Sequence, residues 1–298
     1  MHALLIMGPT ASGKSALALA LARRVNGEIV NADSMQVYRD LRILTARPSP
    51  EDEAEIPHHL YGHVDAGERY SAGRWLRDAV RTITDIEARG RTPVVAGGTG
   101  LYFKALTEGL APAPAAADAV RARLAAELAE AGAAVLHARL ALLDPEAAAR
   151  IGANDAPRVL RALEVAQGGA RLSDLQRRAD PALADWRGFA LWPQRAALYD
   201  AIEARFDLML NAGALEEVRA LAARGLDPAL PAMKAHGVPA LMAYLRAEMS
   251  LEEAIGIAKR DTRRYAKRQF TWMAHQMPDW TRIGPGGADA RLAAVLGG

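Results

Sequence analysis

The sequence contains no cysteine, which excludes disulfides, zinc ribbons and cysteine nucleophiles. It also lacks a long apolar run, since no stretch approaches the roughly 18 residues of a membrane-spanning helix. The apolar run Ala3–Met7 is too short for a signal peptide and leads directly into a glycine loop. We therefore expect a soluble, cytoplasmic protein that is not embedded in a membrane.

An excess of one charge is missing as well. Lys and Arg number 37 against 35 for Asp and Glu. The net charge therefore argues neither for nor against a nucleic-acid partner, and local clusters of basic residues have to decide. With 298 residues, of which 51% are hydrophobic, the chain can form one large domain or two linked domains with a sizeable core.

Short apolar segments that end at glycine or at polar residues indicate a parallel sheet. We expect a helix over Ser15–Arg24. Strands are expected at Ala3–Met7, Glu28–Ala32, Thr92–Ala96 and Phe189–Trp192. Because a strand–helix–strand rhythm gives parallel pairing with right-handed crossovers, the predicted fold is α/β. It is a P-loop NTPase-like parallel sheet with helices on both faces.

The middle of the chain is rich in alanine, the strongest helix former, and predicts an all-helical insertion domain. Asp144-Pro145 and Asp155-Ala156-Pro157 both have the pattern of a helix start. We place the insertion domain at residues 113–187. The P-loop-like catalytic core then comprises residues 1–112 and 188–298.

A glycine-rich loop after the first strand matches the phosphate-binding pattern G-x-x-x-x-G-K-[ST]. Its glycines let backbone N–H groups turn inward, and the following helix offers its positive N-terminus. A chance glycine turn is the alternative, but the strand before the loop and the helix after it favour diphosphate or triphosphate binding. Lys14 supplies a point charge, and Ser15 is a predicted Mg²⁺ ligand. The predicted phosphate-binding residues are Gly8, Pro9, Thr10, Ala11, Ser12, Gly13, Lys14 and Ser15.

Two further strand ends should lie beside this loop. Ligands of open parallel sheets gather at the carboxyl ends of the strands. Asp33 follows the second strand and Thr99 the third. Asp33 is a candidate base and Thr99 a candidate hydroxyl donor to phosphate. The alternative, structural role of Asp33 is to cap the next helix, and that of Thr99 is to supply a hydroxyl to a turn. The sequence contains neither the N-K-x-D motif of GTPases nor a clear motor-type Walker B strand.

Several segments resemble, in order along the chain, the bacterial type of tRNA dimethylallyltransferase, also called tRNA isopentenyltransferase. The likeness spans about residues 3–275 and is more specific than the phosphate loop alone, which many families share. The segments are Gly8–Ser15, Asn31–Arg39, Ile56–Leu60, Gly97–Tyr102, Asn154–Val165, Ile202–Phe206 and Thr262–Trp272.

The resemblance implies transfer of a dimethylallyl group from dimethylallyl diphosphate to the exocyclic amine of the adenosine 3′ of the anticodon. It places Asp33 beside the amine and Thr99 near the bridging oxygen of the departing diphosphate. Lys14 and Arg205 hold that diphosphate, and Mg²⁺ is the expected cofactor. The expected macromolecular partner is the anticodon stem-loop of tRNA, and we expect the enzyme to be a monomer. The implied tRNA contacts are Asp33, Ser34, Met35, Gln36, Arg121, Pro157, Arg158, Val159, Leu160 and Arg161.

A basic cluster near the C-terminus provides a second predicted tRNA contact. Ser250-Leu-Glu-Glu253 is a capping box that opens a long helix, and the chain after Pro193 is predicted to be helical to about Gln276. A solvated helix face is the alternative to contact with RNA phosphates. The residues expected to bind phosphates are Arg263, Arg264, Lys267 and Arg268, together with Lys259 and Arg260.

Two positions depart from the family pattern. Arg47 stands where lysine is common, and His236 lies in Ala-His-Gly-Val where Ala-Ile-Gly-Tyr is usual. For His58, His59 and His63 we expect structural or tRNA-adjacent roles rather than a metal site, because adjacent histidines on a loop rarely converge on one ion. The Leu and Met positions between Phe206 and Leu221 recur at helical spacing and are predicted to pack in the core rather than to form a prenyl pocket.

Two other functions stay open. A small-molecule kinase on the same P-loop scaffold explains the loop, the Mg²⁺ ligand and the sheet, but not the basic helical segments. A non-catalytic, nucleotide-dependent RNA-binding module explains the basic segments. It does not explain why Asp33 and Thr99 should meet the phosphate loop.

Overall fold

A computed structural model describes residues 3–113 and 116–297, and the chain divides into two compact units. The first unit comprises Met1–Thr107 and Leu183–Gly298, and the second comprises Glu108–Ala182. The chain rejoins the first unit at Leu183, whose N–H donates to the carbonyl of Leu106 at 3.0 Å. Of the predicted domains, positions 1, 2, 114, 115 and 298 lie outside the described residues.

A six-stranded parallel sheet forms the centre of the first unit, in the order β3-β2-β4-β1-β5-β6. The predicted α/β sheet is confirmed. The strand expected at Phe189–Trp192 begins earlier, because Trp186 already pairs with Ala3 of β1. Two strands of two and three residues, β3 and β6, were too short to predict. The strands are β1 (Ala3–Met7), β2 (Gly27–Asn31), β3 (His58–His59), β4 (Thr92–Gly97), β5 (Trp186–Leu191) and β6 (Thr281–Ile283).

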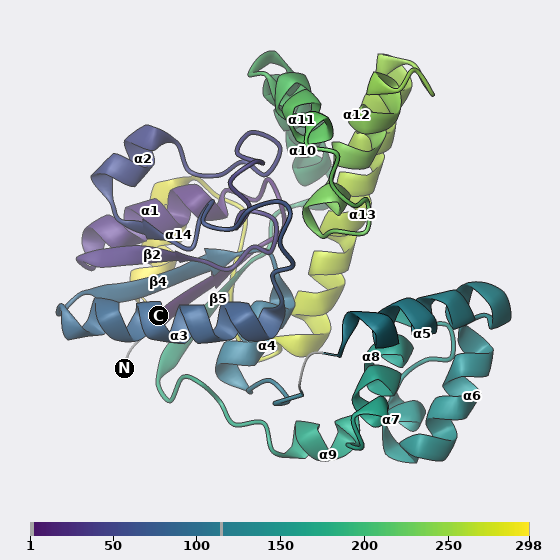
Figure 1. Cartoon of the computed structure of the whole chain (residues 1–298). Coiled ribbons are helices and arrows are strands. Elements are labelled where there is room, and N and C mark those ends of the chain that lie inside the picture. The colour runs from purple at the N-terminus through teal and green to yellow at the C-terminus, as the bar shows by residue number, and fades with distance from the viewer. Residues whose placement is uncertain (1–2, 114–115, 298) are drawn as a thin grey trace. The chain divides into compact units, whose positions relative to one another are not determined.

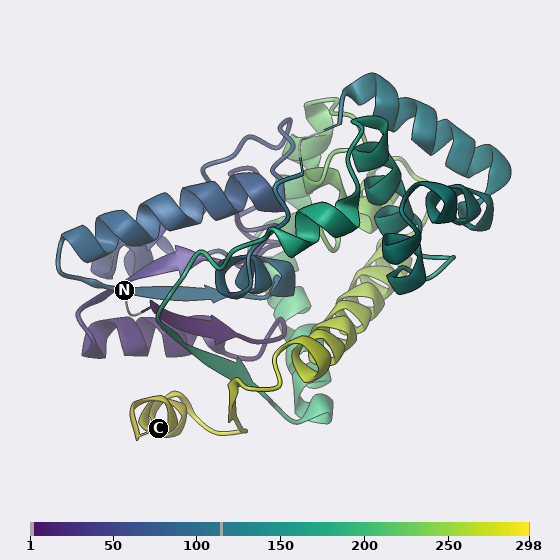
Figure 2. The same cartoon turned by 90° about the horizontal axis from the view of Figure 1, so that it is seen from below.

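Helices cover both faces of the sheet, as predicted (Figures 1 and 2). On one face, Leu17 and Leu21 of α1 and Val295 of α14 share a buried apolar cluster with Ile6 and Phe189 of the strands. Alternate strand residues point to the opposite face, which α3 and α4 cover. These four helices are α1 (Lys14–Arg24), α3 (Ala72–Ala88), α4 (Gly100–Thr107) and α14 (Ala288–Gly297).

The rest of the first unit is mostly helical. The predicted capping box at Ser250 is confirmed, because its hydroxyl accepts from the N–H of Glu253 and the Glu253 carboxylate accepts from the N–H of Ser250. It opens α13, a helix of 26 residues. None of the helices in the described part of the chain is long and apolar enough to cross a membrane. The remaining elements are α2 (Pro50–Glu55), α10 (Arg195–Asn211), α11 (Ala214–Ala223), the 3₁₀ helix η1 (Ala232–Lys234), α12 (Val238–Leu245) and α13 (Leu251–Gln276).

The second unit consists of helices around a separate core that includes Leu124, Leu140 and Val159. The predicted helix starts are confirmed. Asp144 caps α7 by accepting from the N–H of Ala147 at 3.1 Å, and Asp155 caps α8. The helices are α5 (Asp118–Ala131), α6 (Ala133–Leu143), α7 (Pro145–Arg150), α8 (Ala156–Gln167) and α9 (Leu172–Arg177).

Candidate active site

The glycine-rich segment forms a closed loop between β1 and α1. Its base is fixed where the N–H of Gly8 donates to the carbonyl of Gly97 in β4 at 3.3 Å. Two residues adopt the left-handed conformation, Ala11 at φ 61° and Gly13 at φ 83°. Such residues turn the backbone sharply, and successive N–H groups in a turn of this kind create an anion-binding concavity. The predicted loop therefore has the backbone conformation that phosphate binding needs.

Two cationic side chains lie at this loop. Lys14 is buried at the start of α1, and burial lowers the pKa of its ammonium to about 8. The negative charge of Asp33 raises this pKa, and the positive charge of Arg205 lowers it. Arg205 comes from α10 and donates to the hydroxyl of Thr10. Burial lowers the pKa of Arg205 as well, and Asp33 opposes the shift. The structure thus brings Lys14, Asp33 and Arg205 together at one site. Arg205 lies 191 residues after Lys14 and 172 residues after Asp33 in the sequence.

Asp33 lies at the carboxyl end of β2, in a turn rather than at the start of a helix. Its Oδ1 accepts from the N–H of Met35 at 2.9 Å, and its own N–H donates to Oδ1 of Asn31 at 2.8 Å. The N-cap alternative for Asp33 is therefore wrong, because no helix begins within the described segment after it. The turn holds the carboxylate in place and leaves it half-buried.

Thr99 joins two of the predicted segments. Its hydroxyl accepts from the N–H of Ser34 at 2.9 Å and donates to the hydroxyl of Ser34 at 3.3 Å. The backbone N–H of Thr99 also donates to the carbonyl of Ala32 at 3.1 Å. The ends of β2 and β4 are therefore joined beside the phosphate loop, as the strand order predicts.

Helix α13 supplies two residues to the site, and one of them, Gln269, was not indicated by the sequence. Gln269 is buried, accepts from the N–H of Thr10 at 3.0 Å and donates to the carbonyl of Gly98 at 2.9 Å. A Cβ on Gly98 would lie 2.4 Å from the Gln269 amide nitrogen, so this contact requires glycine. The hydroxyl of Tyr265 also donates to the Gly98 carbonyl, at 3.3 Å. Helix α13 thus locks the phosphate loop to the end of β4.

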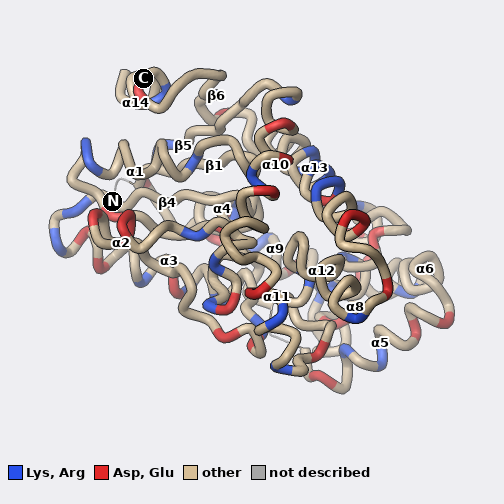
Figure 3. Tube along the Cα trace, turned by 90° about the horizontal axis from the view of Figure 1, so that it is seen from above, with Lys and Arg blue, Asp and Glu red and all other residues tan. Residues whose placement is uncertain are grey.

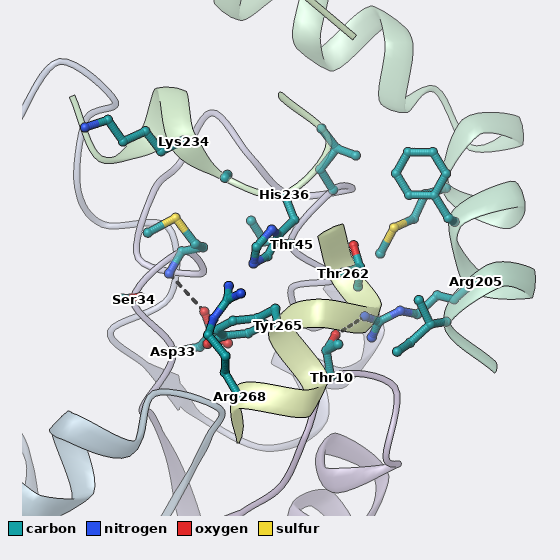
Figure 4. Close-up of a pocket in the computed structure, with 16 residues that line it drawn as sticks. Thr10, Asp33, Ser34, Thr45, Arg205, Lys234, His236, Thr262, Tyr265 and Arg268 are labelled. Carbon is teal, nitrogen blue, oxygen red and sulfur yellow. Dashed lines mark hydrogen bonds between the residues drawn. The ribbon is translucent and has the colours of Figure 1, made fainter. Parts of the chain in front are cut away.

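A pocket opens above these residues, and Figure 4 shows Asp33, Tyr265, Arg268 and His236 pointing toward one another while Lys234 extends away. Asp33 is the one carboxylate that lines it among the residues described. The lining residues are Thr10, Asp33, Ser34, Met35, Leu44, Thr45, Ile202, Arg205, Phe206, Met209, Lys234, Ala235, His236, Thr262, Tyr265 and Arg268.

One wall of the pocket is apolar. Ile202, Phe206 and Met209 line it from α10, where they alternate with solvent-facing residues at helical spacing. The prediction that the positions between Phe206 and Leu221 serve core packing alone is therefore wrong in part. Phe206 and Met209 are buried, as expected, but they also face the pocket. Helical periodicity identifies a buried face and does not distinguish a core from a cavity.

The two departures from the family pattern have different surroundings. Arg47 is partly buried beside Gly62, with a nitrogen 3.8 Å from Glu53, and it does not line the pocket. His236 does line it, with its ring centroid 4.7 Å from that of Tyr265. Burial lowers the pKa of the His236 imidazole, and the positive charge of Arg268 lowers it further. The neutral ring of His236 therefore forms part of the pocket wall.

Magnesium binding was predicted at Ser15, which lies exposed in the first turn of α1. Mg²⁺ usually takes one or two protein ligands and completes its shell with water and substrate phosphates. One exposed hydroxyl beside the phosphate loop fits that demand. Within residues 3–113 and 116–297, no three acidic or histidine side chains converge on a metal position. His59 instead lies 2.6 Å from Glu28, and His58 2.7 Å from the carbonyl of Ile56.

The predicted tRNA contacts after β2 differ in their exposure. Ser34 and Met35 line the pocket beside Asp33. Gln36 is buried, and its amide donates to the carbonyls of Thr45 and Ala46 at 2.8 and 2.9 Å. Gln36 itself does not line the pocket, but its amide holds the backbone of Thr45, which does.

Basic residues recur along the trace of α13 (Figure 3), and their contacts divide them into separate groups. Lys259 and Arg263 pair with Asp207 and Glu203 of α10. Arg268 lines the pocket, with its guanidinium 5.5 Å from the centre of the Tyr265 ring. The exposed members of the cluster are Arg260, Arg264, Lys267 and Arg268.

The predicted tRNA contacts in the second unit cluster around the start of α8. Pro157 and Arg158 are exposed there, whereas Val159 is fully buried in the core of the unit. The Val159 side chain therefore supports α8 from within, and Leu160 is partly buried. Arg121 and Arg161 both approach Glu164, at 4.0 and 3.1 Å. Contact of these residues with tRNA stays a prediction.

Known proteins resemble this chain over nearly its whole length. The profile described as IPP transferase matches residues 36–276, and the profile described as isopentenyl transferase matches residues 1–61. A tRNA dimethylallyltransferase of Nitrobacter hamburgensis is 56% identical over 300 residues, which cover 99% of this chain and 95% of the relative. The solved tRNA isopentenylpyrophosphate transferase of Bacillus halodurans superposes with a TM-score of 0.72 at 35% identity, covering 99% and 94% of the two chains. A eukaryotic dimethylallyltransferase acting on tRNA superposes with a TM-score of 0.81 at 30% identity, covering 95% of this chain and 73% of the other.

Proposed function

The chain belongs to the IPP transferase family, and from this premise we propose that it prenylates the adenosine 3′ of the anticodon in tRNA, with dimethylallyl diphosphate as donor. It is a transferase, and the bond formed joins the exocyclic nitrogen of adenine to the first carbon of the prenyl group. The carbon–oxygen bond to the diphosphate breaks, and diphosphate is released. The observation that carries the proposal is the placement of one carboxylate, Asp33, between a phosphate loop and a partly apolar pocket.

Asp33 is the proton acceptor in this proposal. The adenine amine is a weak nucleophile because its lone pair is delocalised into the ring, so loss of its proton has to accompany attack. A positioned base contributes roughly 10²–10⁴-fold to such a step. Oδ1 of Asp33 is engaged by the Met35 N–H, whereas no hydrogen bond within the described chain engages Oδ2. Oδ2 is therefore the oxygen available to the amine.

The phosphate loop stabilises the leaving group. Negative charge grows on the bridging oxygen as the allylic carbon departs, and preorganised donors and cations stabilise such charge more effectively than water does. The loop N–H groups, Lys14 and Arg205 supply that environment, with Arg205 already anchored on Thr10. Thr99 lies at the end of the neighbouring strand, and we assign its hydroxyl as a hydrogen-bond donor to the bridging oxygen. The apolar wall of Phe206 and Met209 suits the five-carbon chain.

Magnesium would be held by Ser15 and by oxygens of the diphosphate. When bound, it would neutralise part of the charge on the leaving group. This assignment rests on the exposed hydroxyl of Ser15 beside the loop.

The acceptor has to reach the pocket from a structured RNA. A base must leave its stack to enter such a pocket, at a cost of a few kcal/mol that is smaller in a loop than in a duplex. We assign Ser34, Met35 and Arg268 to the adenosine and its neighbours because they line the pocket around Asp33. We expect the enzyme to be a monomer and to act in the cytoplasm.

The test is incubation of the protein with dimethylallyl diphosphate, Mg²⁺ and unmodified tRNA, followed by digestion and mass spectrometry of the nucleosides. We expect one adenosine to gain the mass of a five-carbon prenyl group. Asp33→Asn protein, checked for tRNA binding, serves as the matched inactive control. An unchanged nucleoside profile with active donor would refute the proposal. A phosphorylated small molecule formed from labelled ATP would instead support the kinase alternative, which the family relationship does not favour.

A further inference from the structure

Helix α14 lies beyond the region that matches the IPP transferase profile, which ends at residue 276. It nevertheless belongs to the catalytic unit. Val295 is buried in the same apolar cluster as Leu17 and Leu21 of α1, and Leu292 packs against that cluster. The C-terminal helix is therefore attached to the helix that follows the phosphate loop.

One side chain of α14 reaches the loop itself. Arg291 donates from Nη1 to the backbone carbonyl of Ser12 at 2.6 Å. A Cβ placed on Gly13 would lie 2.9 Å from the same nitrogen, so the guanidinium lies directly against this part of the backbone. Nε of Arg291 is buried and has no hydrogen-bond partner within the described residues. The contact with Ser12 is thus the main polar interaction of a partly buried cation.

The Ser12 carbonyl and the Gly13 N–H belong to the same peptide group. In a trans peptide these two groups point in opposite directions, because the unit is planar. A phosphate loop works only when its N–H groups point inward to the anion. A donor that fixes the Ser12 carbonyl on the outside of the loop therefore turns the Gly13 N–H toward the inside.

The Ser12–Gly13 peptide group needs a contact that fixes its orientation. Gly13 has φ 83°, in the left-handed region, and glycine adopts conformations of either sign of φ with little cost. The peptide before a glycine can therefore rotate more readily than one between residues with side chains. The neighbouring backbone groups are anchored, because the Ser12 N–H donates to the Pro9 carbonyl at 3.2 Å and the Gly13 carbonyl accepts from the Leu17 N–H at 3.1 Å. Neither of these bonds involves the carbonyl of Ser12 or the N–H of Gly13.

We propose that Arg291 is a positioning residue for the diphosphate, holding the Ser12–Gly13 peptide with the Gly13 N–H directed into the loop. The inference rests on the proposed function, because it takes diphosphate as the ligand of the loop. Arg291 acts through the backbone and does not touch the prenyl group or the adenosine. Helix α14 is in this view part of the donor site, although it lies outside the profile of the family.

The experiment compares diphosphate binding in variants of the full-length protein. Arg291→Met keeps the apolar stem of the side chain and removes the donor, and Arg291→Lys restores a cation with fewer donors. We expect Arg291→Met to weaken binding of inorganic diphosphate in calorimetry by roughly tenfold, as loss of one charge-assisted hydrogen bond predicts. Arg291→Lys should recover part of the loss, and tRNA affinity should stay within about twofold of wild type. Arg24→Ala, which removes the same charge from the exposed far end of α1, is the control.

A second readout separates positioning from a general structural role. The amide resonance of Gly13 should shift on addition of diphosphate in the wild type, and this shift should shrink in Arg291→Met. Wild-type diphosphate affinity in Arg291→Met would overturn the inference. Equal losses of diphosphate and tRNA binding, with a lowered melting temperature, would overturn it too. If the wild type itself binds no diphosphate, the proposed function fails instead.

Discussion

At the scale of single residues, the site depends on a carboxylate held by backbone groups. Asp33 accepts from the N–H of Met35, and its backbone is tied to Asn31. Asn31 in turn donates to the carbonyls of Asp33 and Leu60, both at 3.0 Å. These bonds fix the carboxylate before any substrate arrives, and preorganisation of this kind is what a general base needs.

Asp33→Asn should separate chemistry from binding. Asparagine can still accept from the Met35 N–H, so the turn should survive, but it cannot take a proton from the amine. We expect the single-turnover rate at saturating substrates to fall by roughly 10²–10⁴-fold, with tRNA affinity changed by no more than about threefold. Asp200→Asn, the same exchange on the exposed side of α10, should leave both unchanged. A near wild-type rate for Asp33→Asn would reject Asp33 as the proton acceptor.

Lys14 should make diphosphate binding sensitive to alkaline pH. Burial lowers the pKa of its ammonium to about 8 in the free protein, although Asp33 raises it. Bound diphosphate favours the protonated form, so the charge is in place below pH 8. Above that pH the free protein has lost the proton and must regain it on binding. The dissociation constant should therefore rise, approaching a tenfold increase per pH unit.

The matched variant for this prediction is Lys14→Arg. A guanidinium stays protonated throughout this range, whereas titration of the diphosphate itself affects both proteins equally. Calorimetry between pH 7 and 10 should therefore show a steeper loss of affinity for wild type than for the variant. Parallel profiles would show that Lys14 does not titrate in this window.

At the scale of elements, α13 combines three tasks on different faces. Gln269 and Tyr265 hold the phosphate loop and Gly98. Arg263 faces α10, where it pairs with Glu203. Arg260, Arg264 and Lys267 are exposed, and their spacing of four and three residues places them on one face. The predicted contact with tRNA phosphates is therefore best tested on this exposed face.

The double variant Arg264→Ala/Lys267→Ala should weaken tRNA binding and flatten the slope of log affinity against log salt by roughly 1–2 units. Each cation that contacts a phosphate releases about one condensed counterion, which is the origin of that slope. The control is the double variant Lys259→Ala/Arg263→Ala, which also removes two charges, and it should leave the slope nearly unchanged because these cations are paired with Asp207 and Glu203. A salt titration measures both, with diphosphate affinity followed in parallel. An unaltered slope in the double variant would identify the exposed face as merely solvated.

The sequence allowed the phosphate loop, Asp33 and Thr99 to be predicted because each follows a strand in a recognisable local pattern. Gln269 and His236 carried no such signal. They reach the site through the packing of helices more than two hundred residues after the loop, and nothing in their immediate neighbours indicates this. The strands β3 and β6 could not be predicted either, because two or three residues are too few to show an alternation of apolar and polar side chains.

At the scale of the whole molecule, the chain has two separate apolar cores. One includes Ile6, Leu17 and Val295, and the other includes Leu140 and Val159. All the residues assigned to the donor diphosphate belong to the first unit. The units therefore differ in how they should respond to a ligand of the phosphate loop.

Diphosphate should stabilise the first unit selectively. A ligand that binds only the folded state at 100 times its dissociation constant adds about 2.7 kcal/mol, which corresponds to roughly 100-fold slower exchange of amides that exchange through unfolding. We expect this protection in peptides from β1, β4 and α1, and little in peptides from α6 and α8. Hydrogen exchange followed by mass spectrometry measures both in one sample. Lys14→Ala should abolish the effect in the first unit without altering exchange in the second. Equal protection of the two units would mean that they unfold together, and the helical unit would then not be an independent cooperative element.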